Sequence, residues 1–152
     1  METWLTEAKA KAERGITAYQ IQLGNSYLTG RDPDGNEFAR DYAEARKWLE
    51  LAHAKGASTA TLILGTMYEE GKGMAIDIAK AVELYEAAAA RGGFYPCVNL
   101  ARIYARGDQV PKSPELAAEW YEKVMSFESE IDDKEAIDEA RKYLAEHRSH
   151  AK

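Results

Sequence analysis

Apolar side chains recur with helical spacing in two consecutive stretches near the middle of the chain. The first stretch covers residues 59–70 and ends at Gly71-Lys72-Gly73. Its apolar positions are Leu62, Ile63, Leu64, Met67 and Tyr68. The second stretch ends at Arg91-Gly92, and its apolar positions are Ala81, Leu84, Tyr85 and Ala88. A spacing near 3.6 residues predicts two amphipathic helices joined by a turn that contains glycine.

This pair of helices occurs three times. The segment from Leu64 to Gly71 matches the segment from Leu100 to Gly107 at an offset of 36 residues, and an upstream copy runs from Leu23 to Gly30. A period of about 20–50 residues is typical of solenoids, in which stacked units build one shared core. The sequence therefore predicts an all-α fold, namely a right-handed α-solenoid of about three helix–turn–helix repeats with helical caps.

The repeats predict a single domain over residues 1–152, with repeat boundaries near 16–56, 57–92 and 93–128. A half-repeat helix is expected at residues 3–14 and a C-terminal capping helix at residues 132–147. Polar residues with oxygen-bearing side chains stand at the expected helix starts, where they cap free backbone N–H groups. They are Asp41 with Glu44, Ser58, Asp77, Ser113, and Asp132 with Glu135.

Small residues occupy one equivalent position in the first helix of each repeat. They are Gly24, Gly65 and Ala101. A minimal side chain at this point lets paired helices approach closely, so we expect Gly65→Leu to destabilise the fold by overpacking, at a cost of about 1–3 kcal/mol.

The middle unit combines these features into a motif: Leu64-Gly65, Met67-Tyr68, Gly71-x-Gly73, Lys80-Ala81 and Leu84-Tyr85. This motif resembles the Sel1-like repeat (SLR) family, a relative of the tetratricopeptide repeat, and the resemblance covers about residues 10–128. The third copy has Ala101 in place of the usual glycine and Pro96 in place of the usual alanine. The first copy carries a five-residue insertion between Tyr27 and Trp48.

Members of this family act mostly as adaptors and scaffolds, so the resemblance implies protein binding and not catalysis. In tetratricopeptide-like solenoids the first helix of each pair lines a concave face, and the resemblance places the binding residues there. They are Asn25, Leu28 and Thr29 in the first repeat, Leu62, Thr66, Glu69 and Glu70 in the second, and Tyr95, Val98, Arg102 and Arg106 in the third. Asn25, Thr66 and Arg102 are expected to form one row, and Arg102→Glu is expected to weaken binding without loss of stability.

Composition narrows the choice of partner and compartment. The chain has 152 residues and a formal net charge of −6, which argues against nucleic acid and anionic membrane surfaces as partners. We find no apolar run long enough for membrane insertion and no signal-peptide pattern at the start. A cytoplasmic location is favoured, and a periplasmic or secreted location is the alternative if a signal peptide has been removed. Neither the oligomeric state nor the status of Met1 as the native start follows from the sequence.

Side chains capable of metal or nucleophile chemistry are few and scattered. The insertion Asp32-Pro33-Asp34-Gly35-Asn36-Glu37 lacks the glycine and glutamate spacing of a calcium loop, so a plain turn is favoured over a calcium site. His147 and His150 are two ligands without a third. Cys97 is expected to be a packed thiol and His53 a packed or partly exposed side chain. We therefore predict no catalytic residues, no metal and no cofactor.

Two functions of different classes follow. The first is an adaptor or scaffold that binds a peptide or partner segment on the concave face. The second is an immunity- or inhibitor-type protein that occludes a toxin or enzyme, for which the acidic charge would suit a basic partner.

Overall fold

A computed structural model describes residues 3–148, and the statements below refer to these residues. They form eight α-helices and no strand, apart from an isolated antiparallel bridge between Arg31 and Glu37. The chain divides into two compact units, residues 1–84 and 85–152. The boundary falls inside α5 (Ile78–Ala90), and we describe each unit by itself.

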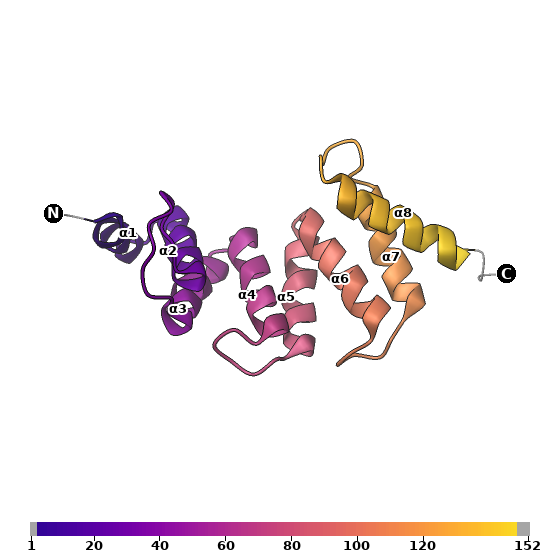
Figure 1. The fold of residues 1–152 in the computed structure, drawn as a ribbon, viewed down its shortest axis with the longest axis horizontal. Coiled ribbons are helices and arrows are strands. Elements are labelled where there is room, and N and C mark those ends of the chain that lie inside the picture. The colour runs from indigo at the N-terminus through magenta and orange to yellow at the C-terminus, as the bar shows by residue number, and fades with distance from the viewer. Residues whose placement is uncertain (1–2, 149–152) are drawn as a thin grey trace. The chain divides into compact units, whose positions relative to one another are not determined.

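Unit 1 contains α1 (Trp4–Glu13), α2 (Thr17–Thr29), α3 (Tyr42–Ala54), α4 (Ser58–Glu70) and the first part of α5. The helices α2 and α3 lie side by side, α1 packs on α2, and α4 packs on α3 (Figure 1). Their apolar faces meet in one core, whose largest fully buried side chains are Leu23, Leu49, Leu64 and Met67. The helical pattern of the sequence thus translates directly into paired helices that share a core.

The expected close approach of paired helices is confirmed at Gly24. A Cβ added there would lie 2.6 Å from Cγ of Leu49 and 3.2 Å from the backbone oxygen of Ala45. Leu49 is fully buried, so its side chain has no free space into which to retreat. Gly24 therefore lets the Leu49 side chain of α3 lie directly against the backbone of α2.

Helix starts follow the sequence in part. Asp41 and Ser113 cap α3 and α7 (Pro114–Met125) through their side chains, and Asp77 accepts a hydrogen bond of 3.0 Å from the N–H of Lys80. The prediction for Ser58 is wrong, because Ala57 occupies the N-cap of α4 and Ser58 is already helical. The side chain of Ala57 cannot accept a capping hydrogen bond, so the first N–H groups of α4 have no side-chain cap from this residue.

Two further capping expectations are corrected. The cap of α8 (Lys134–Arg148) is Asp133 and not Asp132, since the Asp133 carboxylate accepts a 3.1 Å hydrogen bond from the N–H of Ala136. The Glu44 carboxylate accepts a hydrogen bond from the indole N–H of Trp48, at 3.1 Å, so the structure shows only the Asp41 half of the expected capping box.

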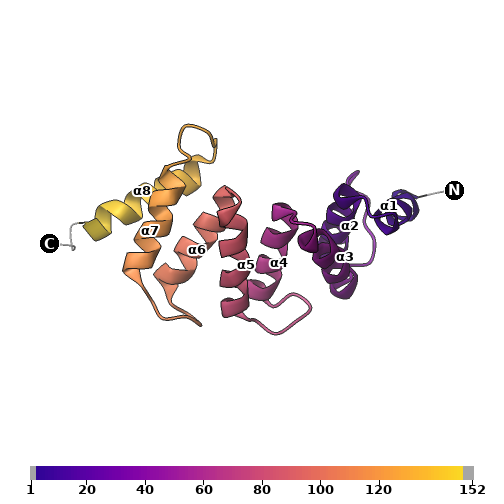
Figure 2. The same ribbon diagram turned by 180° about the vertical axis from the view of Figure 1, so that it is seen from behind.

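Unit 2 contains the last part of α5 together with α6 (Phe94–Arg106), α7 and α8. Here α6 packs on α7 and α7 packs on α8 (Figure 2). The core combines residues of all three helices, namely Phe94, Cys97, Val98, Ala101, Tyr121, Val124, Ala136, Ile137, Ala140 and Leu144. The C-terminal helix is therefore an integral part of this core. No helix in the described part of the chain is long and apolar enough to cross a membrane.

Candidate protein-binding surfaces

One face of α2 is open. Its exposed residues follow one another at steps of four, three and four, which places them on a single side of the helix. They are Ala18, Gln22, Asn25 and Thr29. The Thr29 hydroxyl donates to the backbone oxygen of Asn25 at 3.0 Å, so this hydroxyl is engaged within its own helix. The amide groups of Gln22 and Asn25 remain on the exposed side as donors and acceptors.

The helix α4 carries the same face at the same register, because Gly24 and Gly65 are equivalent positions. The matching residues are Thr59, Ile63, Thr66 and Glu70. Thr59 and Glu70 are exposed, whereas Ile63 and Thr66 are half-buried. The helices α2 and α4 contact each other, and we call these eight residues together the A-helix face of unit 1.

The predicted binding residues of unit 1 lie on this face or next to it. Four belong to it, namely Asn25, Thr29, Thr66 and Glu70, and the Glu70 carboxylate pairs with Lys72 at 2.9 Å. Half-buried residues stand at the edge, namely Leu28, Leu62 and Glu69. Leu28 packs against the core of the unit, so its contribution is structural.

Sequence reasoning missed half of the A-helix face. The missed residues are Ala18, Gln22, Thr59 and Ile63. The signal that could have found them is the helical period itself, counted backward from Asn25 and Thr66 by three and seven residues.

In unit 2 the helix α6 is less open than α2, because residues of α8 pack against it. Val98 is only 1% exposed and belongs to the buried cluster that includes Ile137 and Ala140. The prediction of Val98 as a residue of an open binding face is therefore wrong. Tyr95 is half exposed, and its hydroxyl donates to the Asp133 carboxylate at 3.0 Å.

Arg102 forms a bidentate polar contact in unit 2. Its guanidinium donates to both carboxylate oxygens of Glu139, with Nε–Oε2 at 2.9 Å and Nη2–Oε1 at 2.8 Å. The hydroxyl of Tyr121 donates to the same carboxylate at 2.8 Å. These three residues come from α6, α8 and α7, and so the network joins the three helices of the unit. The expectation that Arg102→Glu leaves stability unchanged does not fit this geometry.

The electrostatics of the network are consistent with a charged pair. Hydrogen bonds from Arg102 hold the pKa of Glu139 below its usual value, and the same bonds raise the pKa of Arg102. Burial, followed by the hydrogen bond to Glu139, raises the pKa of Tyr121. The last predicted residue, Arg106, is exposed and pairs with Asp108 at 3.3 Å.

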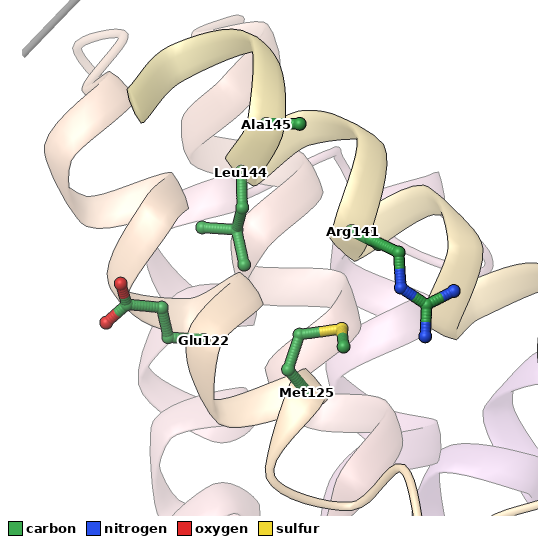
Figure 3. Close-up of a pocket in the computed structure, with 5 residues that line it drawn as sticks. All are labelled: Glu122, Met125, Arg141, Leu144 and Ala145. Carbon is green, nitrogen blue, oxygen red and sulfur yellow. The ribbon is translucent and has the colours of Figure 1, made fainter. Parts of the chain in front are cut away.

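A hollow of about 580 Å³ opens between α7 and α8. Figure 3 shows Leu144 projecting from α8 toward α7 and Met125 projecting from α7 toward α8, with Arg141 at one side. The Arg141 guanidinium already pairs with Asp138, at 2.9 Å, and with Glu128. The hollow is thus a shallow apolar groove whose flanking cation is engaged by carboxylates of its own unit.

The insertion 32–37 is a hydrogen-bonded turn. The Asp32 carboxylate accepts hydrogen bonds from the backbone N–H groups of Asp34, at 2.9 Å, and Asn36, at 2.8 Å, and from the side-chain amide of Asn36. These bonds, with the Asn36 side chain foremost, lower the pKa of Asp32. Within the described residues no group of three or more His, Cys, Asp or Glu side chains could hold a metal ion.

The remaining candidates for reactive chemistry are engaged in packing. Cys97 is buried, and burial raises the pKa of its thiol, which confirms the expectation of a packed thiol. His53 is half-buried, with Nδ1 at 2.6 Å from the hydroxyl of Thr61. The ring of His147 stacks on Tyr143, and His150 lies outside the described residues.

Paired helices that recur with one register and expose one face define the class of helical-repeat scaffolds. The chain belongs to the Sel1 repeat family: the profile of the Sel1 repeat matches residues 17–56, 58–93 and 97–123. Proteins of this family are generally non-catalytic scaffolds that interact with other proteins. A search of curated proteins gave no match.

Two solved structures share the fold. A Sel1 repeat protein from Oxalobacter formigenes is 31% identical, with a TM-score of 0.69 over 93% of this chain and 97% of that one. A protective antigen of uropathogenic Escherichia coli strains, with an SLR fold, is 27% identical, with a TM-score of 0.73 over 96% of this chain. This chain spans only 34% of the antigen's length. Both likenesses establish an all-α solenoid of helical repeats.

Proposed function

We propose that the protein is an adaptor that binds an extended segment of a partner protein on the A-helix face of unit 1. The observation that carries this proposal is the open row on α2, continued at the same register on α4. Family membership supports protein binding in general, and the open face supports this location.

The chemistry of the face suits an extended segment. The amides of Gln22 and Asn25 and the hydroxyl of Thr59 can pair with the backbone N–H and C=O groups of an incoming chain, which a helical partner keeps to itself. Ile63 packs against the core of unit 1 and leaves only part of its side chain for a partner. The corresponding face of α6 is less suited, since Arg102 is held by Glu139.

Site-specific photocrosslinking tests the location. A photoreactive phenylalanine analogue replaces Gln22 on α2, and in a control protein it replaces Leu51, an exposed residue on α3. In lysate of the source cell, we expect the Gln22 variant to capture one partner and the Leu51 variant to capture none. Addition of Asn25→Arg should reduce the yield of the Gln22 crosslink because a long cation then occupies the face.

The opposite pattern would contradict the proposal. A partner captured at Leu51 and unaffected by Asn25→Arg places the interface on the α3 side. The alternative of an inhibitor or immunity-type protein is supported by the net charge of −6 alone. It requires that the captured partner be an enzyme or toxin and that its activity fall when the purified proteins are mixed.

A further inference from the structure

The connection between α2 and α3 is longer than its counterpart in the second repeat. It takes 21 residues to pass from Tyr27 to Trp48, against 16 from Tyr68 to the equivalent Leu84. The extra residues are well held: besides the bonds that Asp32 accepts, the N–H of Phe38 donates to the backbone oxygen of Gly30 at 3.0 Å. The insertion is therefore a preorganised loop.

This loop and the start of α1 enclose a pocket of about 440 Å³. Its apolar wall consists of Trp4, Leu5 and Phe38, all of which pack against the core of unit 1. The Phe38 ring is fixed by an edge-to-face contact with Tyr27, at a centroid distance of 5.6 Å. Pockets of this size accommodate one or two side chains of a bound segment.

The other wall is acidic. It carries the carboxylates of Asp32, Asp34 and Glu37, and among the described residues no lysine or arginine lines the pocket. Bonds within the loop lower the pKa of Asp32, so this carboxylate stays charged. Glu37 pairs at 3.0 Å with Arg31, whose side chain is mostly exposed. A pocket with one apolar wall and one anionic wall favours a ligand that carries both an apolar group and a positive charge.

We propose that this pocket binds a cationic segment of another protein, in which an arginine or lysine neighbours a bulky apolar side chain. The cationic group lies against Asp34 and over the face of the Trp4 indole, where charge and ring quadrupole both attract it. The apolar neighbour packs against Leu5 and Phe38. The five-residue insertion creates this surface, and the surface does not depend on the A-helix face of unit 1.

Nuclear magnetic resonance with short peptides tests the proposal. The probe is a blocked tetrapeptide of glycine, phenylalanine, arginine and glycine, and the matched peptide has glutamate in place of arginine. We expect the arginine peptide to shift the indole N–H signal of Trp4 in a saturable manner and the glutamate peptide to leave it unchanged. Higher salt should weaken the effect, because the carboxylates are exposed.

Two variants with the same change of charge give the control. Asp34→Asn should weaken the arginine peptide about threefold, as expected for an exposed ion pair. Glu50→Gln, on the exposed side of α3, should leave the affinity unchanged. Circular dichroism of both variants checks that the helices are intact. The bond from Asp34 to the Asp32 carboxylate comes from the backbone N–H, which asparagine retains.

Several outcomes would overturn the proposal. Equal shifts with both peptides would remove the charge selectivity, and no shift at about 5 mM peptide would mean a free energy of binding too small for recognition. Calcium chloride that saturates the same signals and blocks the peptide would assign the loop to a metal ion. Signals that move on dilution of the protein alone would assign the pocket to contacts between copies of the chain.

Discussion

At the scale of single residues, the absence of a side chain at Gly24 sets how closely α2 and α3 pack. Gly24 is tolerated in a helix, where glycine normally costs about 1 kcal/mol relative to alanine, because the site has no room for a Cβ. The third repeat has Ala101 at the equivalent position, and this residue is fully buried. The equivalent position thus carries glycine in the first repeat and a buried alanine in the third.

We predict that Gly24→Ala lowers the free energy of unfolding by about 1–3 kcal/mol. The new methyl would overlap Leu49, whose Cγ lies 2.6 Å from the position that the Cβ would take and cannot retreat within the core. Urea unfolding followed by circular dichroism measures the change. The neighbouring variant Asn25→Ala, on the exposed face, serves as control and should change stability by less than about 0.5 kcal/mol. A Gly24→Ala protein as stable as the wild type would show that α2 and α3 can separate at no cost.

At the scale of helices, local sequence signals were sufficient where the interactions are local. Asp41, Asp77 and Ser113 stand at helix starts and bond to N–H groups three residues later, as their position in the sequence predicts. Ser58 looks the same in sequence, but the chain enters α4 one residue earlier. A residue type that favours capping therefore predicts a helix start only to within one or two residues.

The two serines give a direct test of this difference. Ser113→Ala should lower stability by about 0.5–2 kcal/mol, because it removes the acceptor of the Leu116 N–H group. Ser58→Ala should have almost no effect or stabilise slightly, since alanine favours the helix interior. Urea unfolding of both variants in the same buffer measures the contrast. Equal losses would mean that Ser58 caps α4 in solution.

The candidate site was less predictable than the helices, for a non-local reason. Asn25 is exposed and Thr66 is half-buried, so both side chains reach the surface of their helices, and their role in binding stays a prediction. Val98 and Arg102 lie in α6, where residues of α8 complete the packing. No signal within the third repeat predicts that Glu139, 37 residues away, supplies the partner of Arg102.

This long-range contact predicts an acid-sensitive C-terminal helix. The pKa of Glu139 is lowered in the folded protein, so its stabilising effect is present above the pKa of an unfolded glutamate, about 4.3, and is lost as the pH falls through the lower folded value. Glu139→Gln should therefore be less stable than wild type at pH 7, by about 1.5–3 kcal/mol. The difference should shrink toward pH 3, which urea unfolding at several pH values measures. A stability difference that stays the same from pH 7 to pH 3 would contradict the stabilising role assigned to the Glu139 carboxylate.

At the scale of the whole molecule, the two contacts discussed above each lie within one compact unit. Gly24 meets Leu49 and Ala45 inside unit 1, and Glu139 meets Arg102 and Tyr121 inside unit 2. In a repeat protein, stability is close to a sum of local terms and contacts between neighbours, so a change in one region loosens that region first.

Hydrogen–deuterium exchange with peptide resolution tests whether the two compact units open separately. Gly24→Ala should speed amide exchange about tenfold in α2 and α3, which corresponds to about 1.4 kcal/mol, and leave α7 and α8 unchanged. Glu139→Gln should do the reverse, with faster exchange in α6, α7 and α8. Each variant serves as the control for the other, because each should leave exchange unchanged in the unit that the other variant affects. If both variants speed exchange equally in all helices, the chain opens as one cooperative body, and the loss at either site is then shared by every repeat.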